Sequence, residues 1–217
     1  MRIIEDIQLA EMASAYVKAP FDKGRKALKL KEYEIISLEQ DAKLKIEKGK
    51  QNKFYSDLTV LKNGNFVREM VLILPGGKFY LTKRLSTNFY GKGKPPYISS
   101  CEWSQIAIAL EDSVAITDKE VPTNRFGEND LTVYAFGEQA EPYGLYSRSE
   151  GIEKLCIRIS GSEDRPFAMQ LWFGFGTWIS SYGPGGGPDI AFEYLNGIPP
   201  HYINKGRGIV RGFKKMP

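Results

Sequence analysis

The chain has few of the residues on which metal centres and cross-linked scaffolds depend. Its 217 residues include two cysteines, Cys101 and Cys156, and one histidine, His201. Two thiols exclude a disulfide-rich scaffold, and a four-ligand zinc site would need carboxylates to complete it. The composition therefore predicts a protein kept in a reducing compartment, whose buried core alone stabilises the fold.

Long hydrophobic runs are also lacking. No run approaches the roughly 20 apolar residues that cross a bilayer. The first fifteen residues carry Glu5, Asp6 and Glu11, so they lack the basic start and apolar centre of a signal peptide. The formal net charge of +4 indicates solubility rather than a nucleic-acid partner. These features predict one soluble domain, cytoplasmic or virion-associated.

Four segments have the pattern of helices. Residues 3–13 carry early acidic residues among apolar ones, which predicts a helix that ends before Pro20. Ser37 and Gln40 have the spacing of a capping box at the start of a second helix, which Gly49 would end. Apolar residues at helical spacing predict the other two helices at 103–110 and 130–136.

Strand patterns predict a mainly antiparallel sheet. Residues 54–82 contain an Asn-Gly turn signal and an apolar run that stops at Pro75, which predicts a three-stranded meander. Shorter strands are predicted at 155–159, 168–173 and 208–213. The fold class is therefore predicted as α+β, a single domain with its helices on one side of the sheet.

The segment 173–204 differs from the rest of the chain. Its 32 residues include no Lys, Arg, Gln or Met, and its only charged residues are Asp189 and Glu193. Eight aromatic residues lie between Trp172 and Tyr202, in a region rich in glycine. A Gly- and Pro-rich surface loop is one interpretation. The aromatic content instead favours an adaptable binding loop held between two strands, because a solvated linker has no reason to expose large rings.

Four short motifs stand out: LWF at 171–173, GIVRGF at 208–213, VPTNRFG at 121–127 and VYAFG at 133–137. Together they resemble the variable proteins of diversity-generating retroelements, most like their archaeal branch. The resemblance implies a C-type-lectin-like fold with a long irregular C-terminal variable region. It divides the chain into a scaffold, a variable ligand-binding region and a closing strand with tail, at residues 1–172, 173–204 and 205–217.

The resemblance also implies how the variable region arises. In this family, adenine-directed mutagenic retrohoming rewrites AAC and AAT codons, which cannot yield Lys, Glu, Gln, Met or Trp. The lack of Lys, Gln and Met in 173–204 fits that mechanism, whereas Trp178 and Glu193 would have to be fixed. Trp172 and Phe173 are assigned to the scaffold. The positions expected to vary and to face a ligand, which we expect to be another protein, are Phe175, Thr177, Ile179, Ser180, Tyr182, Asp189, Phe192, Tyr194, Asn196, Ile198, His201 and Tyr202.

Catalytic interpretations have weaker support. Acyl transfer would need His201 with Asp189 and a serine such as Ser180, but no GxSxG motif surrounds the serines here. Gly185–Gly187 lacks the Lys and Ser/Thr that follow in a P-loop. Two carboxylates in the segment are too few for a calcium site. We therefore expect a binding protein that is not an enzyme and needs no metal or cofactor.

Basic stripes support one alternative, a protein that binds single-stranded nucleic acid. Lys and Arg residues gather at 18–31, 43–53 and 205–215, where they would line a groove beside stacking aromatic rings. The middle stripe also has acidic neighbours and is equally a solvated helix face. Because the aromatic segment itself carries no basic residue, this alternative ranks second.

Overall fold

The computed structural model describes residues 1–19, 21–51, 65–84, 103–160, 167–174, 177–181 and 208–216. The helices are α1 (Phe21–Lys29), α2 (Leu38–Gln51), α4 (Trp103–Glu111), α5 (Asp130–Phe136) and α6 (Ala140–Ser149). The strands are β1 (Ile4–Gln8), β2 (Met12–Ala19), β3 (Glu34–Ile35), β4 (Asn65–Leu74), β5 (Lys78–Thr82), β6 (Ser113–Ala115), β7 (Glu120–Pro122), β8 (Lys154–Ser160), β9 (Phe167–Gly174), β10 (Thr177–Ser181) and β11 (Gly208–Lys215).

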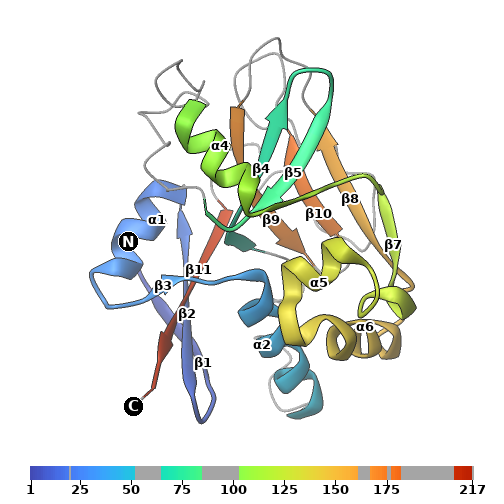
Figure 1. Ribbon diagram of the computed structural model, residues 1–217. Coiled ribbons are helices and arrows are strands. Elements are labelled where there is room, and N and C mark those ends of the chain that lie inside the picture. Colours follow the sequence, from blue (N-terminus) through green and yellow to red (C-terminus); the bar gives the residue numbers. More distant parts are fainter. Residues whose placement is uncertain are drawn as a thin grey trace.

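The last strand lies in the middle of the sheet (Figure 1). The strand order is β1-β2-β11-β4-β9-β10-β8-β7, with β3 paired to β11 and β5 joining β4 to β6. β11 runs antiparallel to β2 along its whole length and meets β4 in parallel at Val210 and Phe66. Among the strands described, only this pair and β10 with β8 are parallel. The predicted α+β class, with a mainly antiparallel sheet, is confirmed.

The predicted first helix at 3–13 is wrong, because this stretch forms the β1–β2 hairpin. Ile4 pairs with Tyr16 and Gln8 pairs with Ala13. The β-branched residues Ile4 and Ile7 favour extended backbone, and β2 gains a second ladder with β11 on its other side. Pairing with a strand about 200 residues further along the chain therefore overrides a weak local helical pattern.

The capping box of α2 is confirmed. The backbone N–H of Ser37 donates to Gln40 Oε1 at 2.9 Å, and the N–H of Gln40 donates to Ser37 Oγ at 3.2 Å. The predicted end at Gly49 is wrong, because α2 continues to Gln51. A glycine inside a helix costs only about 1 kcal/mol, which the packing of α2 offsets.

Other predicted elements are confirmed at nearly their predicted bounds. α4 and α5 match the helices predicted at 103–110 and 130–136. Asn129 caps α5 by accepting hydrogen bonds from two backbone N–H groups. The β4–β5 hairpin turns at Gly76 and Gly77, both with positive φ, which only glycine adopts freely. The first strand of the predicted meander lies outside the described residues.

Helices cover both faces of the sheet, so the prediction of helices on one side is wrong. Met70 and Leu72 of β4 pack in one cluster with Ile106 of α4. Val71 and Ile73 belong to the main core, to which α2, α5 and α6 contribute. Since successive strand residues point to opposite faces, α4 lies across the sheet from those three helices. The uninterrupted apolar run of β4 is the sequence signal of this two-sided burial.

A buried carboxyl group joins β4 to the start of α2. Glu69 Oε2 accepts a hydrogen bond from the N–H of Leu38, in the first turn of α2, at 3.0 Å. Burial raises the pKa of Glu69 from 4.5 to about 7. Between these two pH values the native state therefore holds a proton that the unfolded chain has lost. The contribution of Glu69 to stability falls as the pH rises through this window, by about 3 kcal/mol in all.

Glu69→Gln is expected to remove this pH dependence, because the amide oxygen still accepts from Leu38 and carries no charge. Thermal unfolding of both proteins from pH 4.5 to 8 measures the effect. The variant should match the native protein near pH 5 and exceed its melting temperature by several degrees at pH 8. Parallel pH curves for the two proteins would show that Glu69 does not titrate in this range.

Candidate functional site

The segment 173–204 begins inside the sheet. β9 runs to Gly174, and β10 returns beside it with Trp178 opposite Phe173. On its other side β10 pairs with β8, from Thr177 opposite Cys156 to Ser181 opposite Ser160. β9 confirms the strand predicted at 168–173, whereas the expectation that the following residues are irregular is wrong at 174 and 177–181. Thr177–Ser181 contains β-branched and aromatic residues typical of strands, a signal that the surrounding glycines obscured.

The backbone ladder of β10 suits positions whose side chains differ between proteins. Strand pairing uses N–H and C=O groups, which every residue except proline supplies. Thr177, Ile179 and Ser180 stand opposite Cys156, Arg158 and Ile159 of β8. A change of side chain at these positions leaves the donors and acceptors of the ladder in place.

Phe173 anchors the start of the segment. Its ring is fully buried, with its centroid 5.6 Å from that of Phe136 and 5.9 Å from that of Tyr143. The ammonium group of Lys45 lies 3.8 Å from the centroid of the Phe173 ring, within the range of a cation–π contact. Phe173 therefore packs in the core, as expected of a scaffold residue, while the side chain of Trp172 lies outside the described residues.

A buried ion pair lies beneath this anchor. Lys45 Nζ is 2.6 Å from Asp41 Oδ2, one turn earlier on α2, and the two side chains are 1% and 0% exposed. Burial lowers the pKa of Lys45, whereas the Asp41 carboxylate acts in the opposite direction. Burial also holds the pKa of the nearby Tyr143 hydroxyl well above its usual value. The interpretation of 43–53 as a basic stripe or a solvated face is thus wrong for Lys45.

Arg211 anchors the strand that follows the segment. Its side chain is fully buried, and Nη1 donates to both carboxylate oxygens of Asp6 at 2.9 Å and to Ser14 Oγ at 2.6 Å. The guanidinium carbon lies 5.3 Å from the ring centroid of Tyr16. These contacts fix β11 to β1 and β2. The interpretation of 205–215 as a basic stripe is therefore wrong for Arg211.

Position 212 of the GIVRGF motif must be glycine for a steric reason. A Cβ atom there would lie 2.8 Å from Tyr33 Cβ and 3.0 Å from the carbonyl oxygen of Glu34, both closer than normal contacts. Only glycine lets β3 approach β11 so closely. The Arg-Gly pair of the motif therefore combines a buried charge with a close backbone approach.

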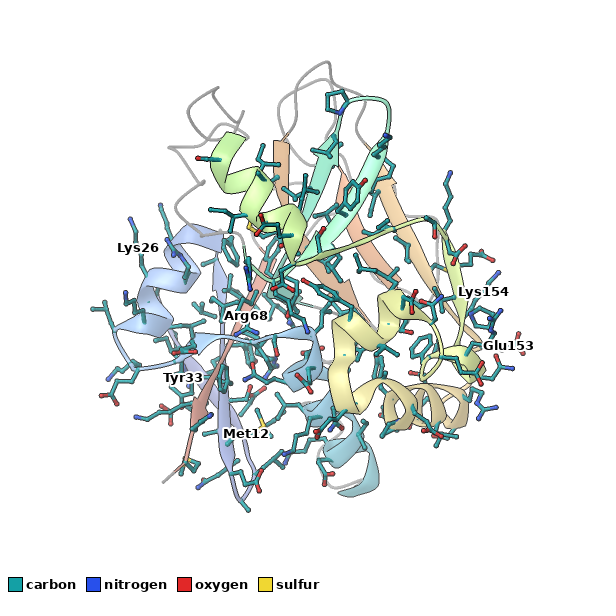
Figure 2. All side chains as sticks on the ribbon, in the orientation of Figure 1. Met12, Lys26, Tyr33, Arg68, Glu153 and Lys154 are labelled. Carbon is teal, nitrogen blue, oxygen red and sulfur yellow. The ribbon has the colours of Figure 1, made fainter. Side chains whose placement is uncertain are left out.

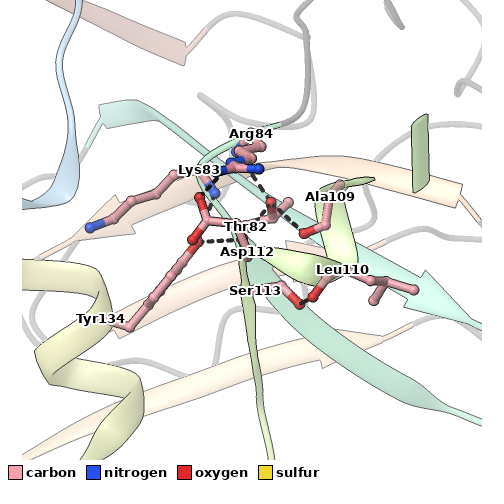
Figure 3. Close-up of polar contacts among 8 residues, drawn as sticks. All are labelled: Thr82, Lys83, Arg84, Ala109, Leu110, Asp112, Ser113 and Tyr134. Carbon is pink, nitrogen blue, oxygen red and sulfur yellow. Dashed lines mark hydrogen bonds and ion pairs between the residues drawn. The ribbon is translucent and has the colours of Figure 1, made fainter. Parts of the chain in front are cut away.

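The other motifs also form scaffold contacts. In VPTNRFG, Thr123 Oγ1 donates to the carbonyl oxygens of Ile152 and Glu153, and the Phe126 ring stacks on Phe136. In VYAFG, the hydroxyl of Tyr134 donates to the carbonyl oxygen of Asp112 at 2.7 Å (Figure 3). These motifs hold helices and loops together.

Figure 3 shows the junction around Tyr134, where β5, α4 and α5 meet. The Tyr134 hydroxyl accepts from the N–H of Lys83 at 3.1 Å, and Thr82 Oγ1 donates to the carbonyl oxygen of Ala109 at 3.2 Å. Arg84 Nε lies 2.9 Å from Asp112 Oδ2. Burial raises the pKa of Tyr134, so its hydroxyl stays a donor at neutral pH. Most of these polar atoms are satisfied by backbone groups, which favours a structural junction over a catalytic site.

The twelve positions predicted to face a ligand fall in two groups. The backbone of Thr177, Ile179 and Ser180 is described on β10, as is that of Trp178, predicted to be fixed. Glu193, also predicted to be fixed, and the other nine positions lie outside the described residues: Phe175, Tyr182, Asp189, Phe192, Tyr194, Asn196, Ile198, His201 and Tyr202. The structure therefore describes β9 and β11, which lie on either side of the predicted site in the sequence, and β10 near its start.

Two further observations concern the described part of the chain. Nowhere in it do three or more His, Cys, Asp or Glu side chains gather as metal ligands would. None of the helices described there combines the length and the apolar composition needed to cross a membrane.

Comparison with known proteins identifies the fold. No family model and no curated protein matches the chain. A solved structure from Nanoarchaeota is similar over 97% of this chain and 100% of its own, with a TM-score of 0.56 and 13% sequence identity. The study of that protein concerns how the C-type lectin fold accommodates massive sequence variation. The chain has a C-type lectin fold, as its motifs led us to expect.

Proposed function

We propose that this protein is a display protein, in which a constant C-type lectin scaffold presents residues 173–204 to a ligand, expected to be another protein. One observation carries the proposal. The segment of unusual composition is bounded by two buried anchors, Phe173 and Arg211. Each anchor packs against residues before position 172, so the framework around the segment is built from the scaffold.

This arrangement separates stability from recognition. Phe173 contacts Phe136, Tyr143 and Lys45, and Arg211 contacts Asp6 and Ser14, whatever residues occupy the variable positions. Variable side chains then change the ligand-facing surface without removing these contacts. Affinity would come from a few Tyr, Phe and Trp rings on a pre-formed framework.

Adenine-directed mutagenic retrohoming is the proposed source of variation. The absence of Lys, Gln and Met from 173–204 supports it. The likeness to a Nanoarchaeota structure that accommodates massive sequence variation on the same fold adds support. We further propose that the protein is not an enzyme and acts by binding alone.

The nucleic-acid alternative loses two of its basic residues. Lys45 and Arg211, one from each of two predicted stripes, are buried in ion pairs with Asp41 and Asp6. Neither contributes to a surface groove. Exposed basic residues remain on α1, and they are considered below.

The DNA around the gene tests the proposed mechanism. A near-copy of the codons for residues 171–217 is expected close by, differing mainly where the copy has adenine, beside a reverse-transcriptase gene. Differences should concentrate at the twelve predicted positions and spare the codons of Phe173 and Arg211. A locus without such a repeat would remove the retrohoming proposal and leave ligand display to be tested on the protein.

A further inference from the structure

One short segment near the start of the chain is strongly basic, as are residues 43–53 and 205–215. Residues 21–31 contain five basic residues and one acidic residue, a net charge of +4. The whole chain also has a net charge of +4, so the remaining residues are balanced. This segment comprises α1 and the turn that follows it.

The fold turns the basic side of α1 to solvent. Phe21 and Leu28 are buried in a cluster with Val210 of β11. Gly24 lies so close to β11 that a Cβ atom there would be 2.6 Å from a methyl group of Val210. The opposite side of the helix is therefore the exposed one.

The large side chains described as exposed on that side are lysines and one leucine. Lys23, Lys26 and Lys29 are exposed, and Leu30, directly after the helix, is 85% exposed. Figure 2 shows Lys26 on the outer side of α1, away from the sheet. In the part of the chain that is described, these three lysines form no ion pair, and the exposed Glu32 is already paired with Lys214. This face, Lys23, Lys26, Lys29, Leu30 and Lys31, is called the α1 face below.

We propose that the α1 face docks on an anionic lipid surface. Clustered lysines are attracted to anionic headgroups, and each one near the surface adds to the binding free energy. An exposed leucine among them inserts its side chain at the headgroup boundary, which strengthens the contact. The inference is independent of the proposed ligand display, because it uses none of the residues 173–204.

The composition of this face favours lipid over nucleic acid. It has four lysines and no aromatic residue, and its one arginine neighbour, Arg25, is only partly exposed. Single-strand binding depends on aromatic stacking, and specific duplex contacts favour the planar fork of arginine. Neither requirement explains Leu30, whereas a lipid surface uses both the leucine and the lysines.

Co-sedimentation of the full chain with vesicles tests the proposal. Binding is expected to vesicles of phosphatidylcholine with phosphatidylglycerol and not to phosphatidylcholine alone, and salt should weaken it. Lys23→Glu/Lys26→Glu/Lys29→Glu should lower the partition coefficient at least about tenfold. The matched control Lys78→Glu/Lys119→Glu/Arg148→Glu makes the same change in net charge at exposed positions elsewhere and should keep most of the binding.

Leu30→Ala distinguishes insertion of the leucine side chain into the lipid surface from charge attraction alone. It should reduce vesicle binding about threefold while keeping the dependence on salt. If the triple glutamate variant fails to fold, Lys23→Gln/Lys26→Gln/Lys29→Gln provides the same comparison without charge reversal.

Three results would overturn the proposal. One is an absence of binding to the anionic vesicles, and another is an equal loss of binding in the control variant. The third is tighter binding of the α1 face to a single-stranded oligonucleotide than to the vesicles, which would assign the face to nucleic acid.

Discussion

Arg211→Ala is expected to destabilise the protein by about 3–5 kcal/mol. The substitution removes a buried guanidinium and leaves the Asp6 carboxylate, itself almost fully buried, without its cation. Ser14 also loses the donor that lies 2.6 Å from its hydroxyl oxygen. Because these contacts hold β11 to β1 and β2, the loss affects the centre of the sheet.

Urea unfolding followed by circular dichroism measures this effect. Lys215→Ala is the control, because Lys215 is exposed on the same strand and should change stability by no more than about 0.5 kcal/mol. Replacing both partners, as in Asp6→Leu/Arg211→Met, should recover much of the loss, since no unpaired charge is then left buried. A loss below about 1 kcal/mol for Arg211→Ala would contradict the anchoring role of Arg211.

Phe173→Ala is expected to cost about 3–5 kcal/mol, by removing a fully buried ring and leaving a cavity. Two aromatic neighbours, Phe136 and Tyr143, lose their contacts, and the buried ammonium of Lys45 loses the ring that it faces. Phe173→Leu should cost less, because it keeps much of the apolar volume.

Thermal and urea unfolding of the Phe173 variants test this expectation. Phe79→Ala is the matched control, since Phe79 is only half-buried on β5 and should cost clearly less. Equal losses at the two positions would show that Phe173 is an ordinary core residue and not a special anchor of the segment.

Local signals in the sequence predicted much of the fold. The capping box at Ser37 and the helix at 130–136 each depend on residues close in sequence, and each is confirmed. The strand at 208–213 is also confirmed, although its partners are distant. At the start of the chain, distant pairing led to a wrong prediction. Residues 3–13 form a hairpin because β2 pairs with β11.

Buried charges were the least predictable feature. Lys45 and Arg211 were interpreted as surface residues because lysine and arginine are almost never fully buried unless paired. Their partners, Asp41 and Asp6, lie 4 and 205 positions away. The four-residue spacing of Asp41 and Lys45 indicates an ion pair on a helix, but it does not show that this side of α2 is buried. The second contact depends on the complete sheet.

The candidate site was predicted from composition and resemblance rather than geometry. The burial of Phe173 agrees with its predicted place in the scaffold, and β10 was missed because it lies in a glycine-rich stretch. All twelve ligand-facing positions remain predictions, since nine lie outside the described residues and only the backbone of the other three is described.

The central claim is that the scaffold folds independently of the residues at the twelve positions predicted to vary. The most direct measurement is the melting temperature of variants in which all twelve predicted positions are exchanged together for combinations of Tyr, Ser, Asn and Asp. Exchanges at positions outside the core cost little each, so most variants should unfold cooperatively within about 10 °C of the native protein. If most of these variants fail to fold, residues 173–204 belong to the core and the display account is contradicted.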